Sequence, residues 1–265
     1  MNNKKMHYAW WIMVSCMAIM FGCTGILVGA QGIFFRSVVE GLRINASEFS
    51  LSLTIGYLAR AFSLPLAGKL LNKYNNRLII SLAIVFHAGA FIFMGLYETI
   101  FGFYISAVIM GTASSITHIM AVPVLINNWF EKRSAIVMGI TMSFSGIGTA
   151  IISYVGAVII YQYGWRTAYY ALGLIAIAMT LPFVIFVIRS KPSEKALFPY
   201  GTEQNLSKTK NMNKSLISEE QIIEEEIHND SLFFIMVIFA VAVGYIMSFQ
   251  AHISNFASSI GVDIV

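Results

Sequence analysis

"GKLLNKYNNRLII", residues 68–80, is a short polar stretch that separates two long apolar runs. The run before it ends in "YLARAFSLPLA" and the run after it begins "SLAIVFHAGAFIF". Three cations, Lys69, Lys73 and Arg77, stand in it beside three asparagines. A membrane helix needs roughly 20 apolar residues, and basic residues gather in the loops on one side of the membrane. The stretch is therefore typical of a tight turn between two membrane helices.

The composition of the whole chain agrees with a membrane protein. Of its 265 residues, 57% are hydrophobic and 11% are charged, and the mean hydropathy is +0.73, whereas a soluble domain carries about 25% charged residues. The apolar runs predict an all-α, polytopic membrane protein with spans over Tyr8–Phe35, Phe49–Ala67, Leu78–Tyr97, Ile100–Ile126, Ser134–Tyr161, Thr167–Ile188 and Ser231–Ala257.

Basic residues are distributed unequally between the two sets of loops. One set, with the N-terminus, holds Lys4, Lys5, Lys69, Lys73, Arg77, Lys132, Arg133, Arg189, Lys191 and Lys195, and the other holds Arg36, Arg43 and Arg166. By the positive-inside rule the N-terminus is cytoplasmic. This orientation argues against a rhodopsin-like or receptor-like seven-helix protein, whose N-terminus lies outside. Because the cations are spread over separate loops, the net charge of +4 indicates topology and no nucleic-acid partner.

Local signals mark the ends of the spans. "NASEF", residues 45–49, has the form of a capping box and predicts a defined helix start. Trp10, Trp11, Trp129 and Trp165 fall at span ends, where tryptophans usually anchor a helix at the membrane surface.

The chain has one long polar segment and a weak internal repeat. The polar segment predicts three parts: a six-helix domain over 1–189, a cytoplasmic linker over 190–230, and a further helix within 231–265. "KYNNR", residues 73–77, matches "QYGWR", residues 162–166, in Tyr and Arg, so Asn75 falls where Gly164 stands. Both residue types tolerate a left-handed backbone, which predicts that Asn75 and Gly164 adopt the same strained turn.

These features together resemble the major facilitator superfamily. Its signature between helices two and three runs approximately Gly-x-Leu-x-Asp-Arg-x-Gly-Arg-Lys/Arg. Gly68, Leu70, Lys73 and Arg77 stand at matching positions, while Asn72 replaces the acidic residue and Asn75 the second glycine. The resemblance implies a conformational latch formed by Gly68, Asn72, Lys73 and Arg77, without the acidic charge.

Longer segments are similar to one branch of that family. "NNWFEKRSAIVMGITMSFSGIG", "YGWRTAYYALG", "RSKPSEKALFPYG" and "FQAHISNFASSIGVD" resemble oxalate/formate antiporter-like and monocarboxylate transporters. The resemblance implies a six-helix N-terminal domain built as a 3+3 inverted repeat, followed by the first helix of a second half. It also implies a missing C-terminal half, so we expect a truncated transporter or a fragment.

Arg60 is the one cation well inside a span, and it is the first candidate for a substrate contact. It shares a helix face with Gly56, Ser63 and Ala67, and Tyr57 adjoins that face. A guanidinium in such a stripe suits a bidentate carboxylate. The alternative is that Arg60 snorkels to the surface or pairs with a backbone carbonyl.

Histidines supply further candidates. His118 shares a face with Ser115 in span four and could carry a coupling proton, although membrane histidines more often bond a neighbouring helix. His87 stands in a span with almost no other polar residue and is assigned a structural role. His252, with Gln250 and Asn255 near the end of span seven, is polar enough to face a cavity.

Two stripes of small residues predict close helix packing. Gly22 and Gly29, with Gly25 and Gly32, lie in span one, and Gly139, Ser143 and Gly146 follow a similar spacing in span five. Family resemblance implies that helices two and five face the opposite half, so the stripe on span five would lack part of its partner.

The sequence shows no metal-ligand spacing, no nucleotide-binding glycine loop and no nucleophile–base pair, so we expect neither an enzyme nor a cofactor. The leading hypothesis is a multi-pass cell-membrane transporter of small organic anions, monocarboxylates or dicarboxylates, working by alternating access with a coupled proton or counter-anion. Its other partner is the lipid bilayer. The alternatives are a non-transporting half-transporter and an efflux transporter of drugs or other solutes.

Overall fold

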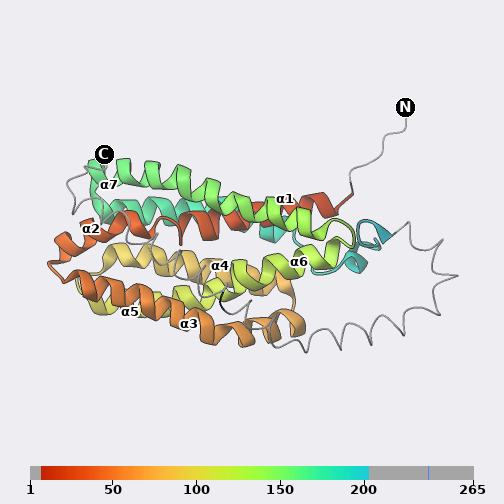
Figure 1. The fold of residues 1–265 in the computed structure, drawn as a ribbon, viewed down its shortest axis with the longest axis horizontal. Helices are drawn as coiled ribbons and strands as arrows, with labels where there is room; N and C mark the ends of the chain where they lie inside the picture. Colours follow the sequence, from red (N-terminus) through yellow and green to blue (C-terminus); the bar gives the residue numbers. More distant parts are fainter. Residues whose placement is uncertain (1–6, 203–237, 239–265) are drawn as a thin grey trace. The chain divides into compact units, whose positions relative to one another are not determined.

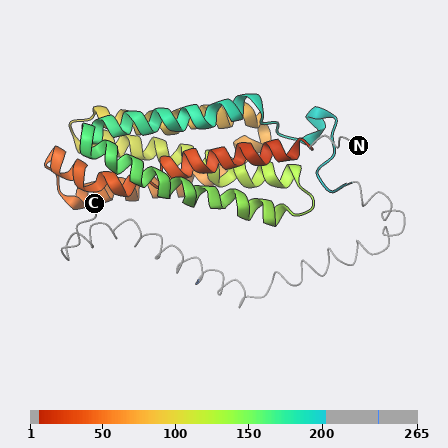
Figure 2. The same cartoon turned by 90° about the horizontal axis from the view of Figure 1, so that it is seen from above.

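The computed structural model describes residues 7–202 and Ile238. The chain divides into two compact units, Met1–Gly201 and Thr202–Val265, and the first unit is a bundle of helices that run lengthwise beside one another (Figures 1 and 2). The predicted seventh span lies outside the described residues except for Ile238. The all-helical fold class is confirmed, since the described part of the chain contains helices and no named strand.

The first span consists of three consecutive pieces. Helix α1 (Ala9–Ile19) continues as a π-helical segment η1 (Met20–Ile26), and after a short turn α2 (Gln31–Leu42) completes it. The whole run, Ala9–Leu42, is 34 residues long, so it extends beyond the predicted end at Phe35.

The second and third spans form a helical hairpin. Helix α3 (Ala46–Lys73) starts after Asn45, whose backbone N–H donates to Glu48 Oε2 at 2.8 Å. Helix α4 (Asn76–Phe93) follows and ends in a short 3₁₀ turn, η2 (Met94–Leu96). The turn predicted from "GKLLNKYNNRLII" is thus confirmed at residues 74–75.

The backbone of that turn differs from the prediction for Asn75. Asn75 is extended, with φ −66° and ψ 113°, and its side chain accepts a hydrogen bond from the Arg77 N–H at 3.0 Å, so it caps α4. Gly164 has φ +82° and ψ 162°. The expectation that the two residues share one strained conformation is wrong, because an asparagine side chain can cap the next helix and a glycine cannot.

The fourth span again contains a π-helical segment. It consists of α5 (Ile100–Ser114), η3 (Ser115–Met120) and α6 (Ala121–Trp129). A π-helical turn changes which side chains share a face, and such turns are frequent at functional sites.

The last two spans together form the 53-residue element α7 (Ser134–Phe186). At 1.5 Å per residue a straight helix of this length would measure about 80 Å, more than twice the thickness of a bilayer core. Gly164 interrupts it with non-helical angles, and the ribbon reverses direction in this region (Figure 2). Within residues 7–202, the five apolar helices long enough to cross a membrane therefore correspond to the first six of the seven predicted spans.

Interspan hydrogen bonds gather at one end of the bundle, which we call the basic end. It comprises Tyr8, the turn at 74–75, the loop at 130–133 and the segment 187–200. The indole Nε1 of Trp129 donates to the Arg189 carbonyl at 2.9 Å, and the Tyr200 N–H donates to the Trp129 carbonyl at 2.8 Å. Most of the cations that sequence analysis placed in one set of loops lie at or near this end.

The segment after the sixth span belongs to this first unit. It contains the turn η4 (Pro192–Lys195), and the Tyr200 ring contacts Trp10 and Phe130. Residues 190–201, which the sequence assigned to the linker, therefore pack against the six-helix bundle up to Gly201.

Glycines allow span one to lie directly against α7. A Cβ on Gly25 would lie 2.8 Å from the Gly148 Cα, and a Cβ on Gly22 would collide with the methyl group of Thr180. Gly29 is equally crowded by Thr149. These contacts join span one to both halves of α7.

The predicted stripe of small residues on span five, Gly139, Ser143 and Gly146, makes no such contact with another described helix. Apart from the adjacent backbone of the same helix, no described atom comes within 4 Å of a Cβ built on Gly139 or Gly146. Ser143 is exposed, and its hydroxyl donates to the Gly139 carbonyl of its own helix at 2.9 Å. This stripe has no helix packed against it in the part of the chain that the structure describes, so its packing role stays a prediction.

Candidate functional site

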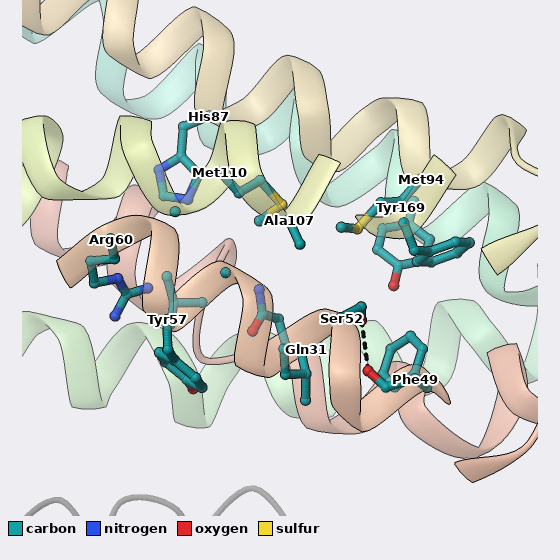
Figure 3. Close-up of a pocket in the computed structure, with 15 residues that line it drawn as sticks. Gln31, Phe49, Ser52, Tyr57, Arg60, His87, Met94, Ala107, Met110 and Tyr169 are labelled. Carbon is teal, nitrogen blue, oxygen red and sulfur yellow. Dashed lines mark hydrogen bonds between the residues drawn. The ribbon is translucent and has the colours of Figure 1, made fainter. Parts of the chain in front are cut away.

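A small cavity opens among the spans, and its wall contains Arg60. Its polar and aromatic lining residues come from five elements: Gln31 of α2, Phe49, Ser52, Tyr57 and Arg60 of α3, His87 of α4, Phe103 of α5 and Tyr169 of α7 (Figure 3). The cavity volume of about 30 Å³ leaves room for about two water molecules.

Arg60 lies at the middle of α3. It is 14 residues from Ala46 and 13 from Lys73, which places it about 20 Å from either end at 1.5 Å per residue. An arginine at this depth is costly, by at least about 2.5–3.5 kcal/mol on insertion scales, and usually marks a functional site.

Two contacts position the guanidinium. Its Nε donates to Ser114 Oγ at 2.9 Å, and that hydroxyl donates in turn to the Gly111 carbonyl at 2.7 Å. The guanidinium carbon also lies 5.1 Å from the centroid of the Tyr57 ring. Within the described residues these hydrogen bonds leave both terminal amino groups of Arg60 without an acceptor.

Close approach of α3 and α5 makes this contact possible. A Cβ on Gly111 would collide with the Gly56 carbonyl oxygen, and a Cβ on Gly56 would lie 3.4 Å from the Ala107 carbonyl oxygen. Ser63 Oγ donates to Thr112 Oγ1 across the same interface at 3.2 Å. The small-residue face predicted around Arg60 therefore packs on span four.

No carboxylate of the described residues neutralises Arg60. The acidic residues of this part of the chain stand at helix ends and in loops: Glu40, Glu48, Glu98, Glu131 and Glu194. The one ion pair seen there joins Arg36 to Glu40. The middle of the described bundle thus carries a cation without a protein counter-ion.

His87 lies in the cavity wall, which its predicted structural role did not anticipate. Its side chain is fully buried, and neither ring nitrogen has a hydrogen-bond partner among the described residues. The ring stacks beside that of His118, with centroids 6.1 Å apart and planes inclined by 26°. Sequence periodicity along α4 could not reveal this. It gives the face on which His87 lies, but not the neighbouring helix that packs against that face.

The other predicted contact residues are distributed differently. Tyr57 lines the cavity, whereas His118 is not among the lining residues. The His118 ring lies beside that of His87 and is hydrogen-bonded through Nδ1 to Thr117 Oγ1 at 3.2 Å. The Ser115 hydroxyl donates to a backbone carbonyl of its own span, and its neighbour Ser114 makes the contact with Arg60. His252 lies outside the described residues.

Nothing in residues 7–202 resembles a metal site, since no three His, Cys, Asp or Glu side chains come together there. The buried Cys16 and Cys23 are separate from the cavity wall.

The family model "Major Facilitator Superfamily" matches residues 11–264. The chain belongs to the major facilitator superfamily. Members of this superfamily transport small solutes across membranes.

Curated members of the superfamily match parts of the chain. It is 20% identical to the MFS-type transporter YcxA of Bacillus subtilis over 191 residues, which are 71% of this chain and 46% of the relative. It is 27% identical to monocarboxylate transporter 12 of Mus musculus over 170 residues, 63% of this chain and 34% of the relative. The Xenopus laevis protein of the same name is 47% identical over 49 residues, 18% of this chain and 11% of the relative. The chain spans less than half the length of these curated relatives.

The superfamily signature maps to the turn between α3 and α4. A Cβ on Gly68 would lie 3.2 Å from the Met120 Cε, so the glycine keeps spans two and four close. Asn72 is exposed, and the Lys73 ammonium lies 5.6 Å from the Tyr74 ring centroid. Neither Lys73 nor Arg77 forms an ion pair within the described part of the chain. The latch role of these residues stays a prediction.

Proposed function

We propose that the protein is a secondary transporter of small organic anions, in particular monocarboxylates, and that Arg60 binds the carboxylate. The observation that carries this proposal is a guanidinium at the middle of a membrane helix, in a cavity wall, with no acidic partner among the described residues. The solute itself would then supply the missing negative charge.

The geometry of the guanidinium supports a carboxylate. Ser114 and Tyr57 engage its Nε and one face, which leaves the two terminal amino groups for a ligand. Arginine binds a carboxylate with two parallel hydrogen bonds, and charge-assisted bonds of this kind are roughly twice as strong as neutral ones. A site of low dielectric strengthens the attraction further.

Relatives give the proposal independent support. Two of the matching proteins are named monocarboxylate transporter 12. A carboxylate solute agrees with the cation, Arg60, in the described cavity of this chain. The name describes those proteins, and its extension to this chain is part of the proposal.

Alternating access is part of the proposal. A cavity of about 30 Å³ is small for a solute of several heavy atoms. Transport would require the spans to separate toward one side and then the other. In the proposed orientation the protein lies in the cell membrane, with its basic end in the cytoplasm.

Uptake into vesicles tests the proposal. The protein is reconstituted with lactate, formate or a lipophilic cation as the labelled solute. We expect uptake of the two anions, and its loss in Arg60→Ala. Arg43→Asn is the matched control, because Arg43 is an exposed cation in a left-handed backbone that asparagine tolerates. Anion uptake that survives Arg60→Ala would contradict the role of Arg60, and uptake of the lipophilic cation alone would favour efflux of apolar solutes.

The same vesicles test coupling. His118 is the proposed carrier of a coupled proton, and a counter-anion is the alternative. Stimulation by an inward proton gradient, lost in His118→Gln, would support the first. Stimulation only by a trapped anion would support the second and contradict the proton role of His118.

A further inference from the structure

His87 has an unusual environment for a buried polar side chain. Its relative exposure is 0%, and both Nδ1 and Nε2 lack a hydrogen-bond partner among the described residues. Buried polar atoms in folded proteins almost always have a partner. An imidazole that has given up water at both nitrogens without replacement is therefore destabilising unless a ligand or water supplies the bonds.

Such a ligand would bind in the cavity whose wall contains Arg60. His87 and Arg60 line the same cavity, and Figure 3 shows the His87 ring projecting from its helix on the side of the cavity where Arg60 lies. They come from neighbouring spans, α4 and α3. A solute in this cavity would meet both side chains.

The imidazole is also fully buried beside a second ring. The His118 ring stacks beside it at 6.1 Å, and His118 is itself bonded through Nδ1 to Thr117 Oγ1. A ring packed in this way loses little additional freedom when it binds a ligand. The described neighbours therefore preorganise the His87 ring but supply no hydrogen bond to either of its nitrogens.

From this arrangement we propose that His87 is a second binding residue for the anion and donates an N–H to the carboxylate that Arg60 holds. A neutral imidazole carries one N–H donor, and a carboxylate accepts several hydrogen bonds. The donor fixes the orientation of the carboxylate relative to the fork of Arg60, so His87 sets specificity for planar acids over other anions. This inference rests on the proposed function of the Arg60 site.

The test uses substitutions that separate binding from packing. His87→Phe keeps a ring of similar size against His118 and removes both nitrogens, so the folded protein should be at least as resistant to heat as the wild type. Its KM for lactate should nevertheless rise about 10- to 100-fold, the range expected for loss of a hydrogen bond to a charged group. His87→Gln retains an N–H donor and should restore part of the affinity. Phe86→Leu, on the exposed side of the same helix, is the matched control and should leave KM unchanged.

The outcomes distinguish this inference from the proposed function. A raised KM in His87→Phe, with heat resistance retained and partial recovery in His87→Gln, supports it. An unchanged KM in His87→Phe, in a protein whose uptake still requires Arg60, overturns the role of His87 alone. Absence of anion uptake by the wild type overturns both. Should His87→Phe fail to insert, His87→Leu removes the same nitrogens and carries the same expectation.

Discussion

The contact between Gly25 and Gly148 offers a sharp test of how spans one and five pack. A Cβ added at Gly148 would lie 2.9 Å from the Phe21 carbonyl oxygen and 3.1 Å from the Gly25 Cα. Optimal contacts between such atoms are about 3.5–4.0 Å, so Gly148→Ala must separate the two helices by roughly 0.5–1 Å. Overpacking of this kind costs about 1–3 kcal/mol.

Gly146→Ala is the matched control, because it makes the same substitution two residues away on the same helix. Apart from the adjacent backbone of its own helix, no described atom lies within 4 Å of its added Cβ. Alanine favours a helix by about 0.8–1 kcal/mol over glycine at either position, so this gain cancels in the comparison. The difference between the two variants then reports the clash alone.

Thermal unfolding in detergent, followed by intrinsic tryptophan fluorescence, measures that difference. With roughly 2–4 °C of Tm per kcal/mol for a chain of this size, Gly148→Ala should unfold about 2–12 °C below Gly146→Ala. Equal Tm values, or a higher Tm for Gly148→Ala, would refute the close packing of these spans.

Two further predictions concern side-chain hydrogen bonds. Ser114→Ala removes the acceptor of Arg60 Nε and should raise the KM for lactate about 2- to 10-fold. The control is Ser115→Ala, which should change the KM less than twofold, because the Ser115 hydroxyl bonds a carbonyl of its own span. Equal effects of the two substitutions would contradict the positioning role of Ser114. Trp129→Phe removes the donor to the Arg189 carbonyl from a fully buried site and should destabilise the basic end by about 1–3 kcal/mol. Trp11→Phe, at a half-exposed position, should stay within about 0.5 kcal/mol of the wild type, and an equal loss in both would argue against the role of the buried bond.

The sequence was sufficient for the fold class and for the positions of six spans. Apolar runs of sufficient length and the polar turn at 68–80 carry that information locally. The capping signal at Asn45 and Glu48 also acts within one turn of helix, so it too is legible without the structure. The left-handed break at Gly164 follows from a residue type that favours it.

The parts that could not be predicted depend on contacts between spans. Trp129 stands at a span end, where a tryptophan usually meets the membrane surface, yet it is fully buried and bonded to the segment after span six. His87 was assigned a structural role because its own helix is apolar. Its place beside the Arg60 cavity arises from the way α3, α4 and α5 pack. Spacing along one helix gives the face that a residue occupies, and the neighbour of that face is decided by close contacts such as Gly111 on Gly56.

The π-helical segment at Ser115–Met120 changes which side chains of span four share a face. With a regular helix, Ser115 and His118 were expected to share a substrate-facing side. In the structure Ser114 contacts Arg60, and His118 packs against His87. A π-helical turn is not encoded by apolar periodicity, so the sequence does not show which polar side chain of span four contacts Arg60.

The central claim is that Arg60 recognises the negative charge of the solute, and a comparison of lactate with lactamide tests it most directly. The two solutes have nearly the same shape and differ in charge, and their initial uptake rates are measured in vesicles containing the wild type or Arg60→Gln. We predict that the wild type strongly prefers lactate, and that Arg60→Gln loses this preference by at least about tenfold, the ratio that corresponds to 1.4 kcal/mol. An unchanged preference in Arg60→Gln would contradict the claim.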